Sequence, residues 1–152
     1  KPISFDLNTI FTPYCTYTVT VLFRSENLDI SFLDKFKYFK DNTLYALLLS
    51  SGKGMLLPFN TAVYRKHDGG IFSQVSQFKQ SLSNYLNFKE IIEKIPACNN
   101  QNFIHKRNIF LFKTIQLAPK SHMKIFIKLI FDVFLLFGLK SALKLGLNKY
   151  LK

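Results

Sequence analysis

The sequence predicts an α/β fold, in which helices flank a sheet, and three observations lead to that prediction. Residues 16–23 alternate Thr with Tyr and Val before an apolar pair, which is the period-two pattern of a strand. A short helix signalled at Asp41 ends at a glycine turn, and extended apolar residues follow it. From Ile71 onward, apolar residues recur at spacings of three and four, which predicts an amphipathic helix packed on the sheet.

Between the predicted strand and Asp41, residues 28–40 interleave apolar side chains with charge. This pattern leaves two interpretations open, a loop or a short helix. Asp41 and Asn42 are residue types that favour a helix N-cap, and the residues after them, 43–49, are mostly apolar. A short helix is therefore predicted here, ending near Gly52.

Two extended segments are predicted next, at residues 55–57 and, after a proline, at 61–64. The amphipathic helix that begins at Ile71 is expected to run to Ile95, because Pro96 stops it. A further helix is predicted over residues 103–117. The apolar positions of the first of these helices are Ile71, Val75, Phe78, Leu82, Tyr85 and Leu86.

The C-terminal tail, residues 120–152, contains seven lysines and one aspartate and thus carries a net charge of +6. Four of these charged residues recur at intervals of four along one predicted helical stripe: Lys120, Lys124, Lys128 and Asp132. Gly138 is expected to kink the helix, and no charge-free run approaches the ~18 residues that cross a bilayer. The tail is either a basic amphipathic helix on an anionic membrane surface or a helix facing the core or a partner, and both interpretations stay open.

Composition sets the limits on domain number and partners. A chain of 152 residues with 48% hydrophobic content can bury one core, and we predict a first unit over 1–95 and a helical extension over 96–152. A net charge of +12 favours an anionic partner. No nucleic-acid-binding signature accompanies the charge, so nucleic acid is not expected as a partner. The isolated Cys15 and Cys98 indicate neither a zinc site nor a redox motif and favour a reducing, cytoplasmic setting.

The most informative stretch runs from Asp41 to Ser73 and reads DNTLYALLLSSGKGMLLPFNTAVYRKHDGGIFS. An acidic residue opening a helix is followed by a glycine turn, an extended segment and the pattern Tyr-Arg-x-His-x-Gly-Gly-x-x-Ser. This order, with Arg24 upstream, resembles the C-terminal portion of the catalytic domain of family-2 glycosyltransferases of the GT-A type, which is Rossmann-like. The resemblance covers residues 12–85, and Lys40 departs from it, since many relatives carry Glu or Gly there.

The resemblance implies a role for each matching residue. Asp41 corresponds to the carboxylate that takes the proton from the acceptor hydroxyl in an inverting transfer, although a plain helix cap is the alternative. Tyr64 and Arg65 would contact the donor phosphates, or else Arg65 would simply sit on a sheet edge, and His67 would reach a divalent metal, Mn or Mg, or else be an ordinary surface histidine. The predicted lid loop consists of Gly69, Gly70 and Ser73, and the alternative for the two glycines is an ordinary turn from a strand to a helix.

The function implied is transfer of a sugar from a nucleotide-sugar donor to a saccharide or lipid-linked acceptor, as in polysaccharide biosynthesis, in the cytoplasm or at the inner face of the cell membrane. The family also carries an Asp-x-Asp pair that holds the metal, and this sequence contains none. The donor-binding half is therefore expected upstream of Lys1, and the chain alone is expected to be inactive. Two alternatives stay open, a non-catalytic membrane-surface or interaction module and an α/β domain with no site of its own.

Overall fold

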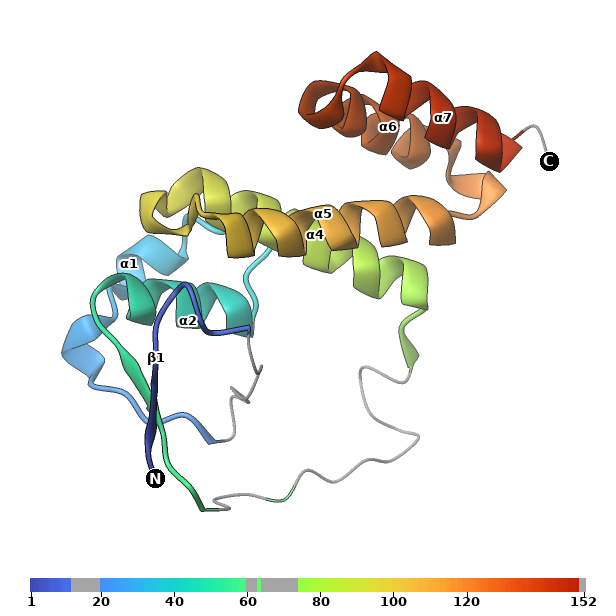
Figure 1. Cartoon of the computed structure of the whole chain (residues 1–152). Helices are drawn as coiled ribbons and strands as arrows, with labels where there is room; N and C mark the ends of the chain where they lie inside the picture. The colour runs from blue at the N-terminus through green and yellow to red at the C-terminus, as the bar shows by residue number, and fades with distance from the viewer. Residues whose placement is uncertain (12–19, 60–62, 64–73, 151–152) are drawn as a thin grey trace.

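A computed structural model describes residues 1–11, 20–59, 63 and 74–150, and those residues are mostly helical, with 66% in helices and 6% in strands (Figure 1). This composition contradicts the predicted α/β fold, and with it the expected portion of a GT-A, Rossmann-like domain. The α-helices in the described part of the chain are α1 (Ile30–Leu33), α2 (Asp41–Ser50), α4 (Gln77–Lys94), α5 (Gln101–Leu117), α6 (Met123–Phe137) and α7 (Leu139–Tyr150). Short 3-10 helices cover Ser25–Asn27, Pro96–Cys98 and Lys120–His122.

The sheet found in the described ranges has two strands, β1 (Ile3–Phe5) and β2 (Gly54–Leu56). They pair antiparallel, with Phe5 opposite Gly54. A Cβ atom on Gly54 would lie 2.2 Å from the Phe5 ring, so only glycine leaves room for that ring. The sequence signals β2 through its apolar run, whereas β1 is too short to show any periodicity.

The strand predicted over residues 16–23 is absent from the part of that segment that the structure describes. Residues 20–23 contain no strand, and residues 16–19 lie outside the described ranges. The extended segment predicted at 61–64 also lies outside them, except for Val63, which is not in a strand. In residues 20–23 the pattern is therefore not accompanied by a strand, which needs a partner strand as well as a pattern.

The predicted short helix after residue 40 is confirmed as α2, but its first residue was assigned wrongly. Asp41 is the first helical residue, and the N-cap position belongs to Lys40. Within the ambiguous stretch 28–40, the short-helix interpretation is confirmed by α1, whose N-cap Asp29 accepts a hydrogen bond from the Phe32 backbone N–H.

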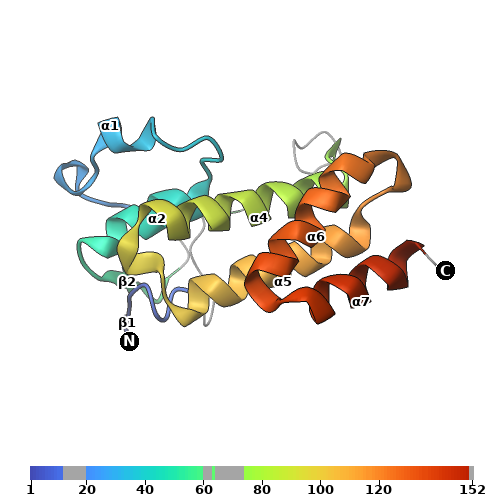
Figure 2. The same cartoon turned by 90° about the horizontal axis from the view of Figure 1, so that it is seen from above.

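α4 and α5 form an antiparallel pair at the centre of the molecule, with α2 and the strands on one side and α6–α7 on the other (Figures 1 and 2). Both helices were predicted, and both begin at side-chain caps, Ser76 and Asn100. The prediction that α4 packs on a sheet is wrong, since it packs on α5 and α2. The predicted boundary near Pro96 falls in the turn between α4 and α5 and stays a prediction.

Two apolar clusters lie on the two sides of the α4–α5 pair. The first joins the N-terminal segment and α2 to α4 and α5, and its members include Ile10, Tyr45, Phe88, Ile91 and Phe103. The second joins α6 and α7 to the same pair, and its members include Tyr85, Leu111, Ile115, Leu129 and Val133. The α4–α5 pair is thus the shared wall of both clusters.

The C-terminal tail forms a hairpin of two helices, because Gly138 adopts a φ of +83° and ends α6. Few residues other than glycine adopt this backbone conformation at low cost. Asp132, the last residue of the predicted charged stripe, does not lie at the surface with its lysines. It is buried, and it accepts a hydrogen bond from the Tyr85 hydroxyl at 2.6 Å and pairs with Lys89 at 2.9 Å. None of the described helices combines the length and apolar character that a bilayer crossing requires.

Candidate functional site

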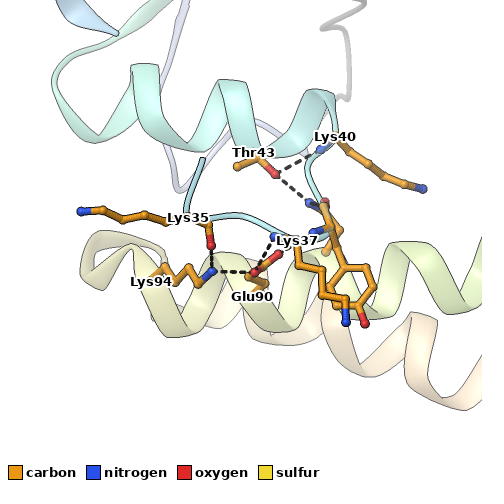
Figure 3. Close-up of polar contacts among 8 residues, drawn as sticks. Lys35, Lys37, Lys40, Thr43, Glu90 and Lys94 are labelled. Atoms are coloured by element: carbon orange, nitrogen blue, oxygen red, sulfur yellow. Dashed lines mark hydrogen bonds and ion pairs between the residues drawn. The ribbon is translucent and has the colours of Figure 1, made fainter. Parts of the chain in front are cut away.

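The chain just before α2 is tied to α4 through one carboxylate (Figure 3). Glu90 accepts hydrogen bonds from the backbone N–H groups of Lys37 at 2.9 Å and Tyr38 at 2.8 Å. The Lys94 ammonium donates to Glu90 at 2.6 Å and also to the carbonyl oxygen of Lys35. Two backbone amides and one cation therefore converge on Glu90, which fixes the direction from which the chain enters α2.

A second polar contact holds the first turn of α2. The Asn87 side-chain amide donates to the Tyr38 carbonyl oxygen at 2.6 Å and to the Thr43 hydroxyl oxygen at 2.7 Å. Asn87 and Thr43 are both fully buried. The Thr43 hydroxyl oxygen also accepts from the Lys40 backbone N–H at 3.3 Å, and the Lys40 ammonium donates to Asn84 at 2.6 Å. Because buried polar groups are costly when unpaired, this arrangement specifies one position for the start of α2.

The electrostatics of this region follow from these contacts. Burial raises the pKa of Glu90, but the hydrogen bonds from Lys94 and from the Lys37 and Tyr38 amides outweigh it, so the net pKa lies below its ordinary value. Burial lowers the pKa of Lys40, and the neighbouring Asp41 carboxylate opposes that effect. Glu90 thus has a structural role, because its carboxylate oxygens bind the Lys94 ammonium and the backbone N–H groups of Lys37 and Tyr38.

Asp41, by contrast, is exposed at the first position of α2. The N-terminal turn of a helix carries unpaired backbone N–H groups and the positive end of the helix dipole, both of which stabilise a carboxylate there. The chain on both sides of Asp41 is anchored, Tyr38 and Lys40 before it and Thr43 after it. This exposed carboxylate on a fixed backbone can accept a hydrogen bond or a proton from a bound hydroxyl.

The other predicted site residues all lie outside the described ranges: Tyr64, Arg65, His67, Gly69, Gly70 and Ser73. The structure therefore does not bring them together with Asp41 or hold them apart from it. Among the residues that it does describe, no three of His, Cys, Asp and Glu gather closely enough to hold a metal ion. The divalent metal, which the sequence analysis assigned to His67, stays a prediction.

A cavity of about 390 Å³ lies along the C-terminal half of α2 and against β2. Its wall is largely apolar, with Phe5, Tyr45 and Met55 among the lining residues, and it includes the cationic Arg24 and Lys53. Asp41 does not line it. The cavity and the exposed carboxylate are thus separate features of α2.

Sequence reasoning missed the anchors of α2, although a signal for them exists. Asn84, Asn87, Glu90 and Lys94 follow one another at spacings of three, three and four, so they share one face of α4. A polar stripe beside an apolar one on the same helix indicates a second packing partner that needs hydrogen bonds. The apolar stripe alone was interpreted, and the polar stripe was overlooked.

Comparisons of the chain with protein-family models, with curated proteins and with solved structures found no match.

Proposed function

We propose that this chain supplies the acceptor-side carboxylate of a glycosyltransferase, with Asp41 as the general base. The observation that carries the proposal is the placement of Asp41, exposed at the N-terminal turn of α2 on a backbone that α4 holds through Glu90 and Asn87. The resemblance of the sequence from Asp41 to Ser73 to family-2 glycosyltransferases supports it. The proposal does not include the GT-A fold, which the helical structure overturns for these residues.

The proposed reaction is a displacement with inversion. An acceptor hydroxyl oxygen attacks the anomeric carbon of the donor sugar, the bond from that carbon to the diphosphate oxygen breaks, and the nucleoside diphosphate leaves with the electron pair. The hydroxyl proton passes to the Asp41 carboxylate, so charge and atoms balance. Asp41 accepts this proton only if the acceptor hydroxyl lies within hydrogen-bond distance, and its rigid placement favours that geometry.

The remaining roles in the proposal come from the sequence resemblance. Tyr64 and Arg65 would bind the donor phosphates, His67 would coordinate a Mn or Mg ion, and the loop formed by Gly69, Gly70 and Ser73 would close over the donor. The Asp-x-Asp pair of the family would have to come from outside these 152 residues, which contain none. The acceptor would be a saccharide or a lipid-linked saccharide.

The experiment compares two aspartates in the complete product of the coding sequence that contains this chain. Release of nucleoside diphosphate from a panel of nucleotide sugars is measured with Mn²⁺ and saccharide or lipid-linked acceptors. Asp41→Asn should lower kcat by about a hundred-fold or more, the usual effect of removing a general base. The matched control is Asp34→Asn, which removes the same charge from another exposed carboxylate and should leave kcat unchanged.

Folding is checked on both variants by circular dichroism. The proposal fails if the protein turns over no nucleotide sugar, or if the Asp41 and Asp34 variants are equally active. His67→Ala gives a second readout, because it should weaken the dependence of the rate on Mn²⁺ concentration while Asp41→Asn should not.

A further inference from the structure

The α6–α7 hairpin leaves an apolar face uncovered on the side away from α4–α5. Phe126, Leu129 and Val133 of α6 are buried against that pair. The other side of the hairpin carries large apolar side chains that are exposed, and on α6 most of them recur every three or four residues, which places those on one face. The exposed residues of this face are Met123, Ile127, Phe131, Phe134 and Leu135 on α6 and Leu139 and Leu143 on α7. Phe137 is exposed as well, but its ring lies against Phe112 of α5 and is not part of the face.

Lysines follow this face in a regular pattern on both helices. Four exposed apolar residues are each followed directly by an exposed lysine: Met123 by Lys124, Ile127 by Lys128, Leu139 by Lys140 and Leu143 by Lys144. One step along a helix turns it by about 100°, so these lysines border the apolar face on one side. Of the ion pairs found among the described residues, none involves these four lysines.

The tail has no acidic side chain at its surface to offset this positive charge. Asp132 is the one acidic residue in the tail, and it is turned inward to Tyr85 and Lys89. The Asp132 carboxylate therefore does not offset the charge of the lysines at the surface of the hairpin. What remains at the surface of the hairpin is a band of large apolar side chains bordered by lysines.

We propose that the α6–α7 face docks in the plane of an anionic lipid membrane. The phenylalanine and leucine side chains would enter the boundary of the acyl chains, while the lysine stems extend so that their ammonium groups reach the lipid phosphates. A helix of 15 residues is about 22 Å long, which suits a helix that lies in the interface. This inference is independent of glycosyl transfer, since it uses no residue of the proposed catalytic site.

The charge pattern favours lipid over two other occupants. A second copy of the chain would bring two rows of lysines together without acidic residues of the tail between them, which opposes self-association through this face. A nucleic acid would use the lysines but not the aliphatic residues, because Ile127, Leu135 and Leu139 cannot stack on bases. An anionic membrane uses both the charge and the apolar area.

Flotation of the full chain with vesicles tests the proposal. The chain should float with vesicles of phosphatidylcholine and phosphatidylglycerol and should float poorly with phosphatidylcholine alone. Replacing Ile127, Phe131 and Leu135 by Ser keeps the charge of +12 and should reduce the partition coefficient about a hundred-fold. Replacing Lys124, Lys128, Lys140 and Lys144 by Gln should reduce it by more than about ten-fold on the anionic vesicles.

A matched control separates this face from general basicity. Replacing Lys1, Lys35, Lys53 and Lys79 by Gln removes the same charge from exposed lysines outside the hairpin and should leave the partition coefficient within about two-fold. The altered side chains of every variant are exposed, so circular dichroism should show the fold retained.

The absence of tryptophan from the sequence allows a site-specific probe. Phe131→Trp places one indole on the proposed face, and Phe59→Trp places one on the side of the molecule that carries β2. The side chains replaced are 57% exposed at Phe131 and 62% exposed at Phe59. On adding anionic vesicles, the emission of the Phe131→Trp variant should shift to the blue and be quenched by brominated lipid. The emission of the Phe59→Trp variant should not change.

Three results would overturn the proposal. The first is that both sets of lysine substitutions reduce flotation equally while the serine substitutions leave it unchanged. This result would mean that the chain binds vesicles through its net charge. The second is no flotation together with a dimer that the serine variant converts to a monomer, which would assign the face to a second copy. The third is equal spectral shifts from Phe131→Trp and Phe59→Trp.

Discussion

The two sides of the α4–α5 pair are attached to their neighbours in different ways. On the α2 side, Glu90 and Asn87 hydrogen-bond to the backbone of the chain before α2, in addition to apolar packing. On the α6 side, the described contacts are mainly apolar and include a polar cluster formed by Tyr85, Lys89 and Asp132. α4 takes part in both contacts, so one helix shows both modes of attachment.

The difference matches the kind of surface that each side presents. Hydrogen bonds to backbone groups fix a position as well as an orientation, and on the α2 side they fix the backbone that carries Asp41, the general base that we propose. Apolar packing is less directional, and the α6–α7 side presents an extended face with little need for atomic placement. A fixed position would suit the proposed general base, and a broad face would suit the proposed docking surface.

The largest expected effect distinguishes a phenylalanine inside the first cluster from one on the exposed face. Phe103 is fully buried, with the rings of Phe11 and Phe88 at 5.1 and 6.1 Å, so Phe103→Ala should lower the free energy of unfolding by about 3–5 kcal/mol. Phe131→Ala, at an exposed site, should change it by less than about 0.5 kcal/mol. Urea unfolding followed by circular dichroism measures both, and equal losses would mean that the α6–α7 face is covered in solution.

The next prediction concerns the acid sensitivity of the α2 side. The pKa of Glu90 is lowered in the folded state, so its stabilising contribution is present above its ordinary pKa of 4.5 and is lost as the pH falls through the folded value. At pH 7, Glu90→Gln should cost about 2 kcal/mol, because the Lys94 ammonium and the backbone N–H groups of Lys37 and Tyr38 all lose their charged acceptor.

The gap between wild type and the Glu90 variant should narrow between pH 7 and pH ~3.5, since the contribution of the charged carboxyl is progressively lost as the pH falls below 4.5 toward the lowered pKa of folded Glu90. Urea midpoints at both pH values measure it. Glu26→Gln, at an exposed site, is the matched control and should show no comparable gap. A gap that is the same at both pH values would show that the Glu90 charge does not hold the entry to α2.

The sequence predicted the helices better than it predicted their partners. The periodicity of α4 located its apolar stripe, but such a stripe packs on a helix as readily as on a sheet, and here it packs on α5 and α2. The strand β1 pairs with β2 across about fifty residues, and the complementarity of Phe5 and Gly54 leaves no trace in any local window. The fold class was therefore predicted wrongly because it depends on contacts between segments that are distant in the sequence.

The candidate site shows the same division between local and distant information. The start of α2 beside Asp41 was predicted because a helix start is a local signal, and only the cap position was wrong, since Lys40 rather than Asp41 occupies it. The inward turn of Asp132 was missed because a four-residue spacing from Lys120, Lys124 and Lys128 placed all four residues on one helical stripe. Only the packing of α6 on α4 shows that this position meets Tyr85 and Lys89.

The last prediction concerns the hydrogen bond between Tyr85 and Asp132 on the α6 side, where a smaller effect is expected. Tyr85→Phe removes the hydroxyl that donates to Asp132 and should lower the free energy of unfolding by about 1 kcal/mol at pH 7. Burial and the hydrogen bond to Asp132 raise the pKa of Tyr85 above its ordinary value of 10.0, which favours the neutral phenol in the folded state. Its contribution should therefore be complete below pH 10 and be lost as the pH rises further, the opposite direction to Glu90.

Tyr38→Phe is the matched control, because the Tyr38 backbone rather than its hydroxyl makes the observed contacts. In the Tyr85 variant, Asp132 keeps its ion pair with Lys89 at 2.9 Å, so the hairpin should stay docked and lose only part of its protection. Hydrogen exchange should accordingly rise in α6 and α7 and change little in α2. If the amides of α2 lose protection equally, the α4–α5 pair transmits the change from one side to the other, and the two attachments cannot be treated as independent.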